Sequence, residues 1–133
     1  MRWGTQPRWA RRTSALYVIG FVEGTGSHAE DLIKGGLHAY RGWPLPSQAL
    51  FHALLVLDLL AAVGIVLAHS AAPVLACAIM AADLTANWWG NWDEVLRDPG
   101  SYLQPAGLLT MTLFGLFVLL TAAPLHRSFA GDA

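Results

Sequence analysis

The chain has 133 residues, of which 55% are hydrophobic and 13% are charged, and its formal net charge is -1. Soluble domains usually carry about a quarter charged residues, so this composition, with its apolar residues in long blocks, is typical of a membrane protein. The absence of a basic excess argues against nucleic-acid binding, because no surplus of positive charge neutralises phosphates. The single cysteine, Cys77, excludes a disulfide within the chain and a four-thiolate metal site. The length predicts one membrane domain over residues 1–133.

The first predicted helix covers about residues 13–38 and is the most polar. Four arginines precede it, but Glu23 and two glycines follow its apolar start where a signal peptide would have its cleavage site, so we expect the helix to be retained. Polar side chains recur at spacings of three and four, which places them on one helical face, suited to a protein interior. These residues are Glu23, Ser27, Glu30, Lys34 and His38. The alternative is a half-length span followed by a surface helix.

Three more apolar helices are predicted at about residues 47–69, 71–92 and 105–124. Twenty residues at about 1.5 Å each cross a hydrocarbon core of about 30 Å. Pro105 is expected at the start of the last helix and Pro124 at its end, since proline is tolerated in a first turn and stops a helix elsewhere. We therefore expect an all-α, multi-pass protein of the cell membrane with four transmembrane helices.

The positive residues in short flanking segments predict the orientation of this bundle. The arginine cluster before the first helix and Arg127 after the last lie on one side, against Arg41 and Arg97 on the other. Cytoplasmic loops carry the excess of lysine and arginine. The bias therefore favours both termini in the cytoplasm, which agrees with an even number of spans.

Three carboxyl groups lie near the middle of predicted helices: Glu23, Asp58 and Asp83. Each costs about 2.5–3.5 kcal/mol at a helix centre on insertion scales, and such residues almost always face a cavity or a partner. Burial favours the protonated form of a carboxyl, which is then a proton donor. We predict Asp83 and Glu23 as catalytic acids and Asp58 as a substrate-binding residue. The alternative, with equal weight for Asp58, is a hydrogen-bonded network that only holds helices together.

Amide and aromatic side chains accompany the third carboxyl. Asn87 follows Asp83 by one turn on the same face and is expected to orient it. Aromatic faces attract cations when water is excluded, so we predict that tryptophans line a path for a cation, although an interfacial aromatic belt explains each of them equally simply. The predicted substrate-binding residues are Asn87, Trp88, Trp92, Asp58, His52 and Trp43.

We predict that the histidines form hydrogen bonds in a cavity rather than bind a metal. No pair has the His-x-x-x-His spacing of a metal site on a helix. No Gly-x-Ser-x-Gly, His-Glu-x-x-His or phosphate-binding loop appears either. We expect no metal and no cofactor, so any chemistry would use carboxyls, imidazoles, amides and indoles.

The chain resembles the small bacterial membrane-bound terpene cyclases that act on prenylated indoles, the drimentine and xiamycin type. The resemblance covers the chain in character: a short multi-span protein, acids such as Glu23 and Asp83 within the spans, and the segment from Asp83 through Asn87 to Trp92. It implies that Asp83 or Glu23 protonates an alkene or epoxide of a lipophilic isoprenoid. Asn87 would orient the acid, tryptophans would line the cation path, and no Mg²⁺ would be needed.

Two other functions fit the same residues. Small four-helix exporters also carry a membrane glutamate, so a proton-coupled transporter is one alternative, which predicts a dimer with a passage to both sides. An accessory subunit of a membrane complex is the other, with its polar residues facing outward. In every case the lipid bilayer is a partner, and an oligomer is allowed. An enzyme instead predicts an internal cavity for a lipophilic small molecule.

Overall fold

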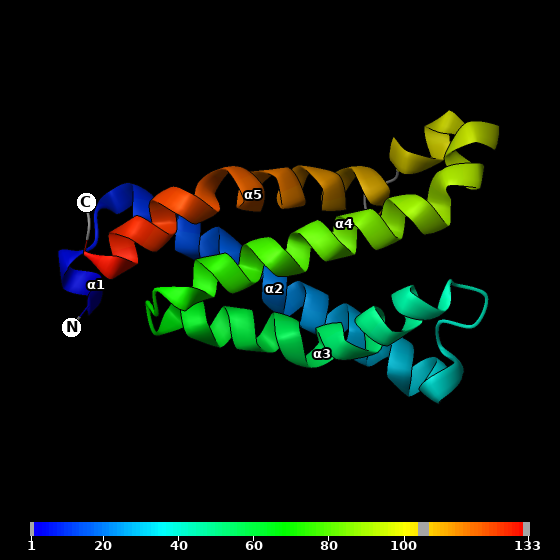
Figure 1. Cartoon of the computed structure of the whole chain (residues 1–133), viewed down its shortest axis with the longest axis horizontal. Helices are drawn as coiled ribbons and strands as arrows, with labels where there is room; N and C mark the ends of the chain where they lie inside the picture. The colour runs from blue at the N-terminus through cyan, green and yellow to red at the C-terminus, as the bar shows by residue number, and fades with distance from the viewer. Residues whose placement is uncertain (1, 104–106, 132–133) are drawn as a thin grey trace.

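The structure, a computed structural model, describes residues 2–103 and 107–131, and within these residues it is entirely helical (Figure 1). The predicted all-α fold is confirmed for this part of the chain. Four long helices form the body of the molecule: α2 (Arg8–Gly35), α3 (Leu45–Val66), α4 (Ala71–Arg97) and α5 (Leu108–Ala130). The shorter elements are α1 (Arg2–Thr5) and the 3-10 turns η1 (Gly36–His38) and η2 (Pro99–Leu103).

Three of these helices, α3, α4 and α5, are long and apolar enough to cross a membrane. Their outer faces carry exposed apolar side chains such as Val56, Leu60 and Leu120. Water would make such a continuous apolar surface unfavourable, whereas lipid solvates it. Helix α2 has 28 residues but is more polar and falls outside this set. The composition of the described helices therefore supports a membrane protein with three candidate spans.

The helix ends follow local chemistry, with differences from the predicted bounds. Helix α2 starts at Arg8, five residues before the predicted start, because Ala10, Ser14 and Tyr17 continue its buried face. It ends at Gly35, and the next residue, Gly36, has a φ of 57°, which favours glycine. Helix α3 has Pro46 in its first turn, where proline fits the helix. Helix α4 continues beyond the predicted residue 92 to Arg97.

Pro124 does not end the last helix, so that prediction was wrong. It lies inside α5, which continues to Ala130 and closes with Gly131 in the left-handed conformation. A proline removes one helical hydrogen bond, but Leu125, Ser128 and Phe129 beyond it are buried, and this packing holds the last two turns. The predicted start at Pro105 lies outside the described residues.

One end of the bundle is closed by packed and hydrogen-bonded side chains. The buried Tyr17 hydroxyl of α2 donates to the Val118 carbonyl of α5 at 3.0 Å and lies 2.8 Å from the Thr121 hydroxyl. The described ends of the chain meet here too, since the Ser128 hydroxyl donates to the Gln6 side chain at 2.6 Å. Figure 1 shows both chain ends at the same end of the bundle as the turn between α3 and α4.

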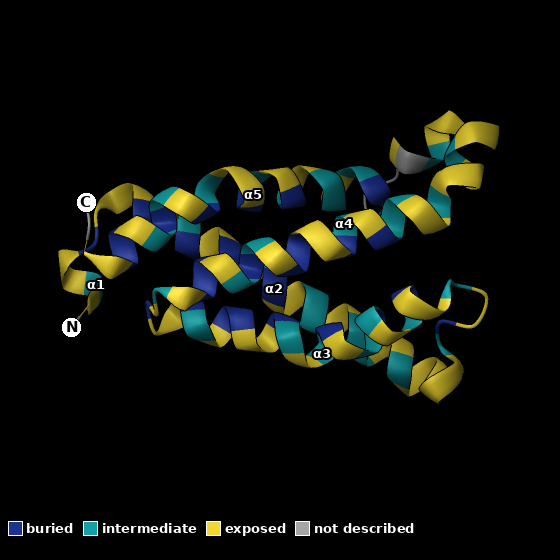
Figure 2. Cartoon of the chain, viewed as in Figure 1, coloured by how far each residue is buried: buried dark blue, intermediate teal, exposed yellow. Residues whose placement is uncertain are grey.

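The other end of the bundle is open. Figure 1 shows the start of α3 and the end of α4 diverging there, and Figure 2 shows mostly exposed residues at the end of α4. The helix backbones that lie close together at one end therefore diverge toward the other.

Gly64→Ala tests the close approach of α3 and α4 near their turn. A methyl group at residue 64 would lie 2.7 Å from the Cβ of Ala72, and neither atom belongs to a flexible side chain. We expect the helices to move apart and the free energy of unfolding to fall by about 1–3 kcal/mol, measured as a lower thermal midpoint in detergent. The matched control is Gly26→Ala on α2, where an added methyl group meets nothing within 4 Å. Its midpoint should hold or rise, and an unchanged midpoint for Gly64→Ala would contradict the packing.

Candidate active site

A cavity of about 990 Å³ lies between the four long helices. Side chains of α2, α3, α4 and α5 line it, together with the connection that precedes α3. Pockets that hold small molecules usually measure about 300–1,000 Å³, so this cavity is large enough for a lipophilic molecule of moderate size. Its lining runs from Leu16, Phe21 and Phe117 to Glu94 and Ser101.

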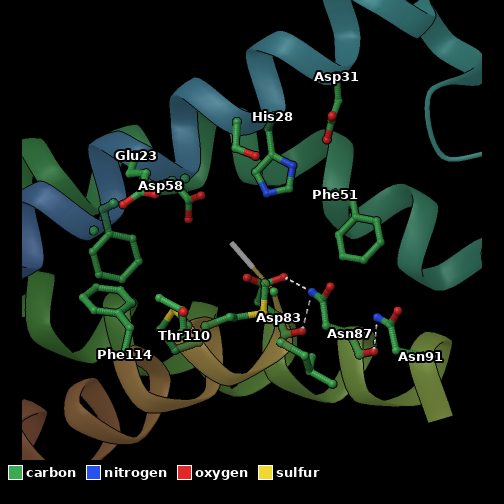
Figure 3. Close-up of a pocket in the computed structure, with 18 of the residues that line it drawn as sticks. Glu23, His28, Asp31, Phe51, Asp58, Asp83, Asn87, Asn91, Thr110 and Phe114 are labelled. Carbon is green, nitrogen blue, oxygen red and sulfur yellow. Dashed lines mark hydrogen bonds between the residues drawn. The ribbon is translucent and has the colours of Figure 1, made fainter. Parts of the chain in front are cut away.

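The three mid-helix carboxyls, Glu23 of α2, Asp58 of α3 and Asp83 of α4, all line this cavity. Each lies near the midpoint of its own helix. Asp58 and Asp83 are 5% and 9% exposed and therefore buried, whereas Glu23, the other predicted catalytic acid, is exposed. Figure 3 shows Asp58 and Asp83 directed into the same space from opposite walls, with Glu23 beside Asp58. Two carboxylates that face one another across an apolar space repel, so one of the pair is expected to keep a proton.

Asp83 is held by the next turn of its own helix. The Asn87 side-chain amide donates to Asp83 Oδ1 at 2.8 Å and to the Asp83 carbonyl at 3.0 Å. Asn91 repeats the pattern one turn later, since its amide donates to the Asn87 carbonyl at 2.8 Å. The second oxygen of Asp83 stays available to the cavity, which also contacts Asn87 and Asn91. The expected alignment of Asp83 and Asn87 on one face is thus present (Figure 3).

Asp58 has a different environment. Among the residues that the structure describes, no group donates a hydrogen bond to its carboxyl. Its Oδ2 atom lies against Gly24 of α2, where a methyl group would sit 2.5 Å away. Glycine at this position therefore leaves the room that the carboxyl occupies. A buried carboxylate without a donor is unfavourable, so Asp58 either keeps a proton or pairs with a cation that enters the cavity.

The cavity face of α2 differs from the predicted polar stripe. Glu23 and Ser27 line the cavity, but Glu30 and Lys34 form an exposed ion pair and His38 is exposed in η1. The prediction that the whole stripe faces the interior was therefore wrong in its second half. Because α2 crosses α3 at Gly24, the face toward the cavity continues through residues 28 and 31 instead of 30 and 34.

The second half of that face carries a hydrogen-bonded chain that the sequence analysis missed. The Tyr40 hydroxyl donates to Asp31 Oδ2 at 3.2 Å and lies 2.8 Å from His28 Nδ1. The phenol has one proton, which Tyr40 uses in its hydrogen bond to Asp31. His28 therefore donates a hydrogen bond from Nδ1 to the Tyr40 oxygen and keeps an acceptor at Nε2. Burial and the Asp31 carboxylate raise the pKa of Tyr40, which keeps its proton. All three residues line the cavity.

The predicted aromatic residues divide between the cavity and the outer surface. Trp43 lines the cavity, and its ring packs on Gly90 of α4. The centroid of this ring lies 5.0 Å from that of the Phe51 ring. His52 is not among the lining residues, and its ring lies 5.1 Å from that of Tyr40.

Trp88 and Trp92 lie outside the cavity, with Trp89, around a shallow depression on the surface of α4. The Trp88 indole donates to the Thr112 hydroxyl of α5 at 2.9 Å. Trp89 and Trp92 are each more than half exposed. This placement agrees with an interfacial aromatic belt and separates both predicted tryptophans from the carboxyls.

The charge of the cavity is one-sided. No lysine or arginine among the described residues lines it. Five carboxyl side chains do: Glu23, Asp31, Asp58, Asp83 and Glu94. The rest of the wall is apolar or aromatic, with rings from Phe21, Tyr40, Trp43, Phe51, Phe114 and Phe117. In residues 2–103 and 107–131, no three histidine, cysteine, aspartate or glutamate side chains are grouped as metal ligands.

Comparison of the chain with protein-family models, with curated proteins and with solved structures finds no match. The chemistry of the cavity therefore has to be inferred from its own residues.

A lipophilic carbodiimide tests whether Asp58 or Asp83 holds a proton, because it reacts with protonated carboxyls in apolar surroundings. We expect the wild-type protein in detergent micelles to be labelled at Asp58 or Asp83 and not at the exposed Glu30, as mapped by mass spectrometry of peptides. The labelling should fall at least tenfold in the Asp58→Asn, Asp83→Asn double variant. Labelling of exposed carboxyls alone would contradict a protonated group in the cavity.

Proposed function

We propose that this protein is a membrane enzyme that cyclises or isomerises a lipophilic isoprenoid, such as a prenylated indole, by protonation from a carboxyl in the cavity. The observation that carries the proposal is the pair formed by Asp58 and Asp83, nearly buried at mid-helix in one cavity with aromatic walls. Protonation of an alkene requires an acid in a site from which water is largely excluded, because water would capture the carbocation.

In the proposed reaction, Asp83 is the general acid. Its proton forms a new C–H bond with one carbon of a terminal alkene, using the electrons of the double bond, and leaves a carbocation on the other carbon. The Asn87 amide stabilises the carboxylate that remains, since its hydrogen bond to Oδ1 strengthens as charge develops. Asn87 therefore acts as a positioning residue for Asp83.

A second double bond of the substrate then attacks the cation and closes a ring. Finally a C–H bond beside the last cationic carbon breaks, its electrons form a new double bond, and the proton passes to a carboxylate of the Asp58 and Asp83 pair. The pair regains its single proton and the product is an isomer of the substrate. Asp58 stabilises the cation by its negative charge, since among the described residues it is the buried carboxyl that faces Asp83 across the cavity.

The positions of the polar residues favour an enzyme over the two alternatives. A transporter needs a passage that reaches both sides, whereas the contacts of Tyr17 with α5 close one end of the cavity in this structure. An accessory subunit is expected to present its polar residues outward, whereas Asp58 and Asp83 line the interior. Leu16 and Ile19 line the cavity and are more than half exposed, so the proposal places the entrance for a lipophilic substrate beside them.

We also propose that α2 crosses the membrane with the other three helices and that both termini lie in the cytoplasm. Its 28 residues span about 42 Å at about 1.5 Å each, and it packs against α3 and, to a lesser extent, against α5. The arginines near its start have the bias expected of a cytoplasmic flank.

Cysteine labelling tests this orientation in a Cys77→Ser background. We expect a membrane-impermeant maleimide to label Leu37→Cys and Gly100→Cys in intact cells, and to label Thr5→Cys and Ala130→Cys only after lysis. If Thr5→Cys and Leu37→Cys react from the same side, α2 does not span.

Conversion of farnesylated indoles and free isoprenoid alcohols tests the activity in membranes that contain the protein. Wild type should form a product of unchanged mass, followed by chromatography and mass spectrometry. Asp83→Asn should lose at least about 100-fold of this activity, since general acids contribute about 10²–10⁴-fold. The matched control is Glu30→Gln, an exposed carboxyl outside the cavity, which should keep it. An Asp83→Asn variant with full activity would remove Asp83 from the mechanism.

A further inference from the structure

Among the described residues, the carboxyl groups of the cavity have no basic partner in its wall, and three of them, Glu23, Asp31 and Glu94, are exposed. Five carboxyls line it without a lysine or arginine among the described residues. The basic side chains lie elsewhere: Lys34 pairs with Glu30 on the surface, and Arg41 and Arg97 are exposed near the open end. Charges in a cleft with low-dielectric walls reinforce one another and raise the local concentration of ions of opposite sign.

Within this wall, Asp58 provides a defined binding point for a positive charge. It is 5% exposed, and none of the described residues donates a hydrogen bond to it, although Asp83 opposite has Asn87 as a donor. Its carboxyl is aimed into the cavity from α3 (Figure 3). Buried polar groups normally have a hydrogen-bond partner. The described residues supply none to the Asp58 carboxyl, so a bound ligand would be its partner.

Aromatic rings surround the approach to this carboxyl from the open end. Phe51 has the rings of Tyr40 and Trp43 at 5.0 Å and is stacked with His28 at 6.1 Å. The Phe114 ring of α5, which also lines the cavity, lies directly on Gly20 of α2. Aromatic faces bind a desolvated positive charge, most strongly when it is spread over a poorly hydrated organic cation.

We infer that the cavity is a binding site for a lipophilic organic cation, a molecule with one lasting positive charge on an apolar body, such as a quaternary or protonated amine. The charge would pair with Asp58, and the body would contact the rings and the apolar wall. A hydrated metal ion fits less well, because the described residues group no three ligands for it. This inference goes beyond the cyclisation proposed above, because it concerns a stable ligand and requires no reaction.

Two probes of the same shape and opposite charge test the inference. Purified protein in uncharged detergent micelles is titrated with tetraphenylphosphonium and, separately, with tetraphenylborate, and binding is measured by equilibrium dialysis. We expect the cation to bind wild type at least tenfold more tightly than the anion. Equal binding of the two probes would overturn the inference without the need for any variant.

Substitutions then locate the charge. Asp58→Asn should weaken binding of the cation at least tenfold. Gly24→Ala should weaken it too, because the added methyl group displaces the Asp58 carboxyl, whereas Gly26→Ala on the same helix should bind as wild type. Thermal midpoints identify any variant that fails to fold, and Gly24→Ala keeps the test valid if Asp58→Asn is one. Unchanged binding by a folded Asp58→Asn would also overturn the inference.

The outcomes separate this inference from the proposed function. Selective cation binding without any isomeric product would support the ligand site and contradict the cyclase. An isomeric product from a protein that binds both probes equally would contradict the ligand site and leave the cyclase in place.

Discussion

The burial of two carboxyl groups at the middle of apolar helices is the constraint on which the rest of the structure depends. Asp58 and Asp83 lie where lipid would make an unpartnered charge costly. The helices meet this constraint with a shared cavity, an amide on the next turn of α4, and glycine at residue 24 where α2 passes the Asp58 carboxyl. Without these features, both carboxyls would have to face lipid or closely packed side chains.

The bundle is asymmetric along its axis for reasons of side-chain size. At the closed end, small residues such as Gly64 and Ala72 let the helices approach, and Tyr17 ties α2 to α5. At the other end, the rings of Trp43 and Phe51 occupy the space between α3 and α4 and keep them apart. The carboxyls lie between these two regions. Acid chemistry and cation binding both depend on that position, since each uses a nearly buried carboxyl in a cavity with aromatic walls.

Periodicity and composition predict much of this architecture, because they report on helices one at a time. The all-helical fold, the apolar character of α3, α4 and α5, and the alignment of Asp83 with Asn87 are properties of single helices. Contacts between segments far apart in the sequence decide the rest. Tyr40 meets His28 and Asp31 only because the chain turns at Gly36. Trp88 lies outside the cavity, where its indole N–H donates a hydrogen bond to the Thr112 hydroxyl of α5. Packing against the N-terminal segment likewise carries α5 past Pro124.

The most direct test of proton-initiated cyclisation is the reaction in D₂O. A proton that Asp83 delivers exchanges with solvent, so the isomeric product should carry one deuterium on the carbon that was protonated, and its mass should rise by about one unit. The same product made in ordinary water should have the mass of the substrate. A product without solvent deuterium would mean that no exchangeable acid starts the reaction, and the carboxyl pair would then need another role.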